Sequence, residues 1–231
     1  MSTLNIDQLL RKGQHWTGVA FSAFLSLHLF NTMTGAISQH LYDAVQEQLR
    51  KIYRPTWLMV RSAEYVCILG PLAIHIMCSI GRMIIRSRQS TQPKYEHNYT
   101  WFNYLKSKLE APKLHRYSGL ILLAIIPIHT FATRFTFHVD CDFSVVTHSM
   151  ERKPGFAIMF PYYSLMILAG VYHMMYGLNA ALLKYSWSRR RVFTMFGIVA
   201  SVVFVGFMGM SGMLYPDRID RSKYAIWKNY Y

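Results

Sequence analysis

Five long apolar runs limit what this chain can fold into more than any other feature. Each is about twenty residues long, and polar, basic stretches separate one run from the next. A helix needs about 20 residues to cross a hydrocarbon core of about 30 Å, and the runs lack the alternation of membrane strands. The sequence therefore predicts an all-α integral membrane protein. Its five transmembrane helices are expected at residues 16–37, 63–85, 117–137, 160–183 and 192–214.

The five spans leave no room for a soluble domain, so residues 1–231 are expected to form a single membrane domain. Within it the chain repeats itself. Glycine precedes histidine by ten residues in the first span, at Gly18 and His28, and again in the third, at Gly119 and His129. We predict two tandem two-helix repeats, over residues 13–88 and 113–185, and a fifth helix after them. An odd number of spans puts the two chain ends on opposite sides of the membrane.

The charge and the cysteines exclude several classes of protein. The net charge is +14, but Lys and Arg lie in the loops between apolar runs, so we expect contact with anionic lipid headgroups and no nucleic acid. Cys67 and Cys78 lie within one span and no CxxC pair occurs, which argues against a disulfide framework or a zinc site. No phosphate-binding loop, nucleophile–base set or buried carboxylate pair appears. The chain is therefore expected not to be an enzyme, and a role as an electron-transfer subunit stays open.

Four spans each carry one histidine near the middle, and ionisable groups inside a membrane are costly and usually functional. At 1.5 Å per residue, His28 and His129 both lie roughly 18 Å from the N-terminal side. His75 and His173 lie on spans that run the other way, at a second level roughly 6–8 Å from the first. Depth therefore pairs His28 with His129 and His75 with His173.

Two pairs at two depths are the arrangement expected for two haems stacked in a four-helix bundle, each iron held by two imidazoles. We predict two haems b, with His28, His75, His129 and His173 as axial ligands of the iron. Zinc would require its ligands at one level, and histidines that only bond neighbouring helices are the remaining alternative. Small residues near the histidines would leave room for haem: Gly18, Gly35, Gly81, Gly119 and Gly177.

His15 and His115 lie at the interfacial ends of their spans. They are expected either to contact headgroups or to hold haem propionates or a quinone head, and Arg116 suits an anionic propionate. In the fifth span Gly206, Gly209 and Gly212 form a face that permits close helix approach. That face would serve packing within the chain or a homo-oligomer. Segments 42–55 and 99–109 are expected to form short interfacial helices.

The run His115-Arg-Tyr-Ser-Gly119 resembles the HRxSG signature of the cytochrome b anchors of succinate dehydrogenase and fumarate reductase. His75, followed by Gly81 and Arg82, is loosely similar to their HxxxGxR motif. The resemblance implies a five-span dihaem anchor that pairs its first helix with the third and its second with the fourth. The sequence departs from this pattern at Pro112, where a serine that helps bind quinone is expected, and in the spacing of Gly81.

A second resemblance extends over nearly the whole chain. Residues 26–31, 72–75, 128–134 and 170–177 are similar to a fungal family of mitochondrial multi-pass membrane adapters. Its best-known member recruits a lipid-transfer protein and supports vacuole–mitochondria contacts and lipid homeostasis. The likeness implies a mitochondrial membrane, the outer in preference to the inner, although the Pro-x-Pro docking motif of that adapter does not occur in this chain.

Two functions follow from these patterns. The first is an adapter-like protein of lipid homeostasis or organelle contact that keeps a two-haem histidine bundle. The second is a dihaem anchor that passes electrons between a peripheral dehydrogenase and quinone. A third interpretation keeps the histidines for packing alone.

Overall fold

The computed structural model describes residues 3–53, 65–89, 110–133, 142–151, 154–184 and 186–222. These residues contain no strand, which confirms the all-α prediction for this part of the chain. A π-helical turn, Tyr65–Leu69, leads into α4, and a 3-10 turn, Pro216–Arg218, follows α9. The α-helices are α1 (Thr3–Thr34), α2 (Gln39–Tyr53), α4 (Gly70–Gln89), α6 (Ala111–Phe131), α7 (Phe143–Glu151), α8 (Gly155–Ala181) and α9 (Arg189–Met210).

Four helical segments of the described chain are long and apolar enough to cross a membrane, as expected of a multi-pass membrane protein. They match the second to fifth predicted spans: Tyr65–Arg88, Ala111–Phe131, Gly155–Ala181 and Arg189–Met210. The first predicted span lies in α1, which is helical as far as Thr34 but does not reach the same hydropathy. Polar residues of α1 that line a cavity, among them Ser22, His28 and Asn31, lower its hydropathy. The fifth crossing stays a prediction.

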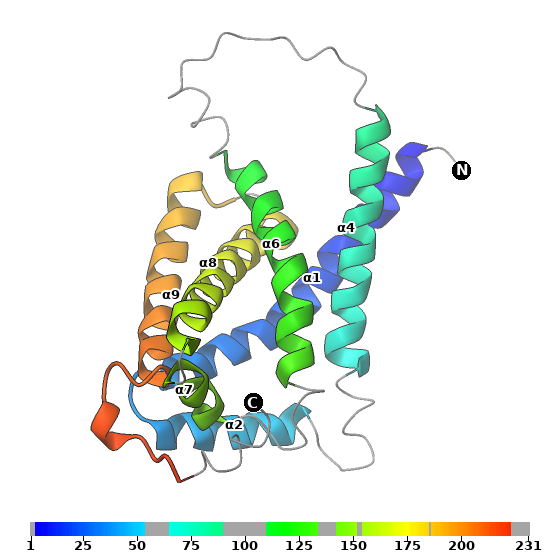
Figure 1. The fold of residues 1–231 in the computed structure, drawn as a ribbon. Helices are drawn as coiled ribbons and strands as arrows, with labels where there is room; N and C mark the ends of the chain where they lie inside the picture. Colours follow the sequence, from blue (N-terminus) through cyan, green and yellow to red (C-terminus); the bar gives the residue numbers. More distant parts are fainter. Residues whose placement is uncertain are drawn as a thin grey trace.

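The helices associate as two pairs. α1 packs along α4, and α6 packs along α8, while α1 also crosses α8 and α9 (Figure 1). Each pair overlaps the range of one predicted repeat, and the repeats themselves stay a prediction. α9 covers α8 and the C-terminal half of α1. Where α1, α8 and α9 meet, the chain buries its main apolar cluster, which includes Leu29, Val171, Val203 and Phe207. By contrast, α4 exposes apolar side chains such as Met77, at 70%, as expected of a helix that faces lipid.

Glycines hold α9 against α1 at very close range. A Cβ atom on Gly209 would lie 1.9 Å from the carbonyl oxygen of Gly35, and one on Gly206 would lie 2.1 Å from that of Thr32. Two predictions are therefore corrected. Gly35 makes room for α9 and not for haem, because it lies at the end of α1 that contacts α9. Gly212 lies beyond the end of α9, where its φ of 79° suits a left-handed turn.

The glycine face of α9 is thus occupied by α1 of the same chain. Small residues let two backbones approach in this way because no side chain stands between them. Association of two copies of the chain stays a prediction, and it would need another surface or the displacement of α1.

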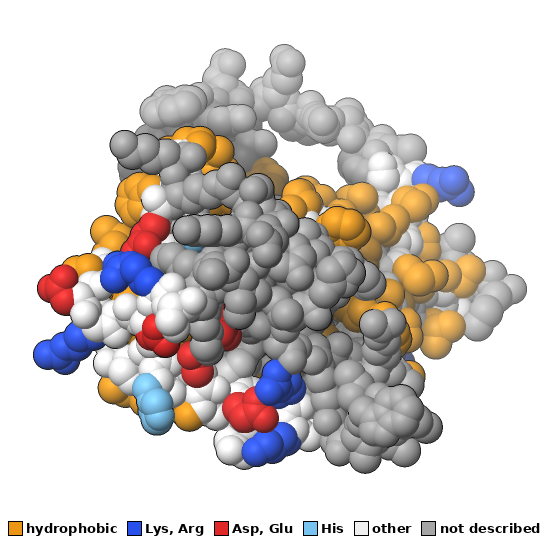
Figure 2. Space-filling model, turned by 60° about the horizontal axis from the view of Figure 1, so that its bottom comes forward, with side chains coloured by type: hydrophobic (Ala, Val, Ile, Leu, Met, Phe, Trp, Pro, Cys, Tyr) orange, Lys and Arg blue, Asp and Glu red, His pale blue; other side chains and the backbone are white. Residues whose placement is uncertain are grey.

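The predicted interfacial helix at 42–55 appears as α2, which begins at Gln39 and lies across one end of the bundle (Figure 1). It buries Tyr42 and Leu49. Charged side chains gather on this end of the molecule, and apolar ones lie to one side of it (Figure 2). The other predicted interfacial segment, 99–109, lies outside the described residues.

Candidate functional site

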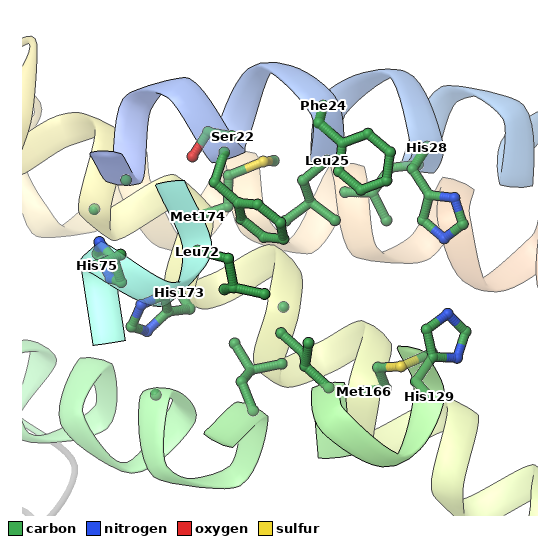
Figure 3. Close-up of a pocket in the computed structure, with 18 of the residues that line it drawn as sticks. Ser22, Phe24, Leu25, His28, Leu72, His75, His129, Met166, His173 and Met174 are labelled. Carbon is green, nitrogen blue, oxygen red and sulfur yellow. The ribbon is translucent and has the colours of Figure 1, made fainter. Parts of the chain in front are cut away.

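A cavity of about 2200 Å³ lies between the α1–α4 pair and the α6–α8 pair. Pockets for one small ligand usually measure about 300–1,000 Å³, so this cavity has room for more than one. Its middle is apolar, with Phe24, Leu72 and Met166 among the lining residues (Figure 3). Residues of α2 and α7 close one end. All four mid-span histidines line the cavity.

The structure brings the histidines together in the two pairs that depth predicts. The ring centroids of His28 on α1 and His129 on α6 are 6.3 Å apart. Those of His75 on α4 and His173 on α8 are 6.1 Å apart. The two pairs lie at opposite ends of the cavity's apolar middle, and the rings of His28 and His129 face each other across a gap (Figure 3).

These separations suit one metal atom between two imidazoles. A metal–imidazole bond of about 2 Å on each side, and roughly 1 Å from nitrogen to ring centre, puts two axial rings about 6 Å apart. In the described parts of the chain, no three His, Cys, Asp or Glu side chains come close enough to hold a metal ion. Each pair instead offers the two nitrogen ligands that a haem iron takes from a protein.

Backbone carbonyls orient one histidine in each half of the bundle. Nδ1 of His75 lies 2.9 Å from the carbonyl oxygen of Gln14, and Nδ1 of His173 lies 3.1 Å from that of His115. A carbonyl oxygen can only accept a hydrogen bond, so in each neutral ring Nδ1 carries the hydrogen and Nε2 keeps a free lone pair. Such a bond fixes the ring of a metal-binding histidine and raises its basicity.

The two carbonyl acceptors occupy equivalent positions in the two halves of the bundle. Gln14 comes four residues before Gly18, and His115 comes four residues before Gly119. A Cβ on Gly18 would meet Cε1 of His75 at 3.0 Å, and one on Gly119 would meet Cε1 of His173 at 3.0 Å. These glycines were expected to leave room for haem, and what they accommodate in the structure is the imidazoles of His75 and His173.

The other two glycines of that prediction do not face a mid-span histidine. A Cβ on Gly81 would meet Leu10 at 3.1 Å, and one on Gly177 would meet Cε1 of His115 at 3.6 Å. Gly81 therefore brings α4 close to α1, and Gly177 makes space for the ring of His115.

The His28–His129 pair is also built symmetrically. Thr32 donates to the carbonyl oxygen of His28, and Thr133 donates to that of His129, each from four residues further along the chain. Phe24 stacks beside His28, and Tyr163 meets the ring of His129 edge-on. The two aromatic contacts restrict the rings of His28 and His129 at this end of the cavity.

His115, His15 and Arg116, the residues expected at the membrane interface, differ in how close they lie to the histidine pairs. The ring of His115 stacks on His173 with centroids 4.0 Å apart, and among the described residues nothing bonds its buried Nδ1. His15 and the exposed Arg116 line the cavity at the same end. His115 is therefore deeper in the site than a headgroup contact would be, because Gly177 leaves its ring space beside α8.

The two ends of the cavity differ in charge. Most of the lining cations lie next to His75 and His173, and the lining carboxylates lie next to α2. The first group is Arg11, Arg82, Arg86, Lys113 and Arg116, and the second is Asp43, Glu47 and Asp142, of which Glu47 pairs with Arg50. An anionic group on a ligand would be stabilised at the basic end.

Sequence reasoning missed the residues that support the histidines. Ser118 places its Oγ 3.2 Å from Nδ1 of His173, and Gln14 holds His75 through a backbone atom. Arg82 on α4 pairs with Asp7 on α1. The repeat contained a signal for Gln14, since this residue occupies the position of His115, but no pattern reveals a carbonyl acceptor.

Fold and site together define a class: a multi-pass helical membrane protein with two histidine pairs inside one large cavity. Comparison with protein-family models, curated proteins and solved structures finds no match. The resemblance to the dihaem anchors and to the fungal adapters accordingly stays a prediction from the motifs.

Proposed function

We propose that this protein binds two haems b within the membrane, one between His28 and His129 and one between His75 and His173, and that it transfers electrons between them. The observation that carries the proposal is the separation of the paired rings, 6.3 Å and 6.1 Å. Packing alone does not require both pairs to adopt the spacing of a metal–bis-imidazole unit. A bound haem would supply one-electron chemistry at its iron.

The surrounding residues support the same assignment. The Nε2 atoms of His75 and His173 carry no hydrogen, because in each ring Nδ1 carries it and donates it in a hydrogen bond to a backbone carbonyl. Propionates are anionic, so those of a haem in this pair would be stabilised by the basic end of the cavity, where Arg116 and Lys113 lie. His115 and His15 lie at that end too and would lie near the same propionates.

Histidine variants test the haem proposal directly. The purified protein should show a b-type absorption spectrum with two haems per chain. His28→Ala should remove about half of the absorbance, because each pair serves one iron. His28→Ala with His129→Ala should remove no more than that, since ligands of one site act as a unit. His28→Ala with His75→Ala should abolish the signal.

His40→Ala is the matched control. His40 is an exposed histidine of α2 that does not line the cavity, so its loss should leave the spectrum unchanged. A wild-type protein that stays without Soret and α bands when haem is supplied would leave the histidines a packing role.

The cellular role is a separate part of the proposal. The paired rings favour an electron carrier with a peripheral dehydrogenase as its partner. The likeness to the adapters favours lipid homeostasis or contact at a mitochondrial membrane, with a lipid-transfer protein as partner. Deletion of the gene distinguishes the two. Loss of assembled succinate dehydrogenase supports the electron carrier, whereas a disturbed mitochondrial lipid balance with intact succinate-driven respiration supports the adapter.

A further inference from the structure

Arg82 ties the C-terminal part of α4 to the N-terminal part of α1. Its Nε donates to Oδ1 of Asp7 at 3.0 Å, and its Nη1 donates to the side-chain oxygen of Gln14 at 2.5 Å. The Arg82 side chain is only 14% exposed. Arg86 lies 3.7 Å from the other oxygen of Asp7. We call Asp7, Gln14 and Arg82 the α1–α4 clamp.

The clamp is connected to the histidine site through one residue. Gln14 takes a hydrogen bond from Arg82 with its side chain and one from Nδ1 of His75 with its backbone carbonyl. Three successive contacts therefore lead from the carboxylate of Asp7 to the imidazole of His75. In the other half of the bundle, His115 replaces Gln14, and the stacked ring of His115 and the hydroxyl of Ser118 support His173 instead.

Asp7 keeps the clamp charged at neutral pH. The hydrogen bond from Arg82 lowers the pKa of the Asp7 carboxyl below its usual value, and the positive charges of Arg82 and Arg86 lower it further against the effect of burial. The guanidinium of Arg82 can serve both partners because its donors form a rigid, planar fork. Lysine has one point charge and could not keep both contacts in the same geometry.

We propose that Arg82 and Asp7 are positioning residues for His75: through Gln14 they hold the carbonyl that keeps the hydrogen on Nδ1 and turns Nε2 towards the cavity. A ligand of a metal site must be held within about 0.5 Å of its productive position, and the clamp adds two hydrogen bonds to the packing of α4 on α1. The iron-binding part of this inference rests on the proposed function. The tautomer of His75 does not depend on haem.

The tautomer is therefore measured first, in haem-free protein labelled with ¹⁵N at histidine, by NMR in detergent or bilayers. Wild-type His75 should hold its hydrogen on Nδ1. Arg82→Gln and Gln14→Leu should each raise the population of the other tautomer roughly five-fold, the factor for one ordinary hydrogen bond. The double variant should do no more than either single change. His173 should keep its tautomer throughout, which shows that the bundle is intact.

Arg11→Gln is the control for charge. Arg11 is a cation of α1 that lines the same end of the cavity and is not part of the clamp, so its loss should leave His75 unchanged. Equal effects of Arg11→Gln and Arg82→Gln would overturn the proposal, as would a His75 tautomer that Arg82→Gln or Gln14→Leu leaves unaltered. If Arg82→Gln also loses the His173 signals, which would mean that the bundle is disturbed, Arg82→Lys replaces it. This variant keeps the charge, and the same shift in the tautomer of His75 is expected.

Haem-loaded protein gives an independent readout. The low-spin signal of one haem should change in Arg82→Gln and in Gln14→Leu, and the signal of the haem between His28 and His129 should not. A change in both signals would overturn a role specific to His75. If the wild-type protein takes up no haem, the proposed function fails, and the NMR measurement still decides whether the clamp sets the tautomer.

Discussion

Gly18 and Gly119 set how closely the histidines of the second pair fit between the helices. Each lies one helix away from its histidine, and a methyl group at either position would come within 3.0 Å of the imidazole. At that distance the ring must move, since it cannot rotate away without losing its carbonyl partner. The hydrogen bond to the carbonyl and the contact with the glycine therefore together set the direction of Nε2.

Gly18→Ala should displace the ring of His75 and weaken haem binding at the His75–His173 site. A change next to a metal ligand typically costs 10- to 100-fold in affinity, and we expect roughly ten-fold here. Haem titration followed by absorbance should show one site weakened and one unchanged. Gly197→Ala is the control, because a Cβ at Gly197 meets nothing within 4 Å. Equal effects of the two variants would contradict this account of Gly18.

Tyr215 is a second residue whose environment matters, because it links the stability of the fold to pH. Its hydroxyl donates to the carbonyl oxygen of Gly35, at the end of α1. Burial raises the pKa of Tyr215 to about 12. Since the folded state favours the protonated phenol, this stabilisation is complete below pH 10, the usual tyrosine value, and is lost as the pH rises from about 10 to 12.

Tyr215→Phe should therefore be less stable than the wild type at neutral pH and should lose less stability between pH 10 and 12. Unfolding in denaturant, measured at several pH values in detergent, gives the comparison. A constant difference between the two proteins over this range would show that the titration of Tyr215 is not linked to folding.

At the scale of elements, α1 and α9 approach each other so closely that no side chain fits between them at two positions. Gly206 and Gly209 face backbone atoms of α1, and backbone cannot move aside as a flexible side chain can. Lipid tails are as apolar as the helices they surround, so helices in a membrane associate largely through van der Waals contacts of this close kind.

Gly209→Ala should push α9 away from α1 and cost about 3 kcal/mol or more, at the upper end of the range for overpacked sites. The same change at Gly197, on the open face of α9, should instead stabilise the helix by about 0.5–1 kcal/mol, the difference in helix propensity between alanine and glycine. Denaturation in mixed detergent micelles measures both values. Equal destabilisation by the two variants would mean that α9 does not contact α1 as described.

At the scale of the whole molecule, the number of crossings determines where the chain ends lie. Four segments meet the length and hydropathy of a span, and α1 supplies the fifth crossing of the prediction. Its less apolar composition fits a helix that faces the cavity on one side, because residues such as His28 and Asn31 point towards the cavity and not towards lipid.

Tags at Met1 and Tyr231 should accordingly show opposite accessibility to protease in intact organelles. Five crossings put the two termini on opposite sides, and four put them on the same side. Tags that are cleaved together would remove α1 from the set of transmembrane helices, whatever the histidines bind.

The sequence by itself determined the helical class, the second to fifth spans and the pairing of histidines. These depend on quantities that are local to each segment. An apolar run must be helical in lipid because its backbone groups have no other partners, and depth follows from counting residues at a fixed rise per residue. The partners of His28 and His75 could therefore be predicted before any contact between helices was known.

Only the tertiary structure decided which face of each helix meets which neighbour. The clamp around Arg82, the stack of His115 on His173 and the placement of Gly35 against α9 all depend on how the helices rotate and tilt. Rotation and tilt are set by close packing between segments distant in the chain, and the spacing of residues in one segment does not contain them. For the same reason, no pattern could show that the carbonyl of Gln14, a group that every residue has, would hold His75.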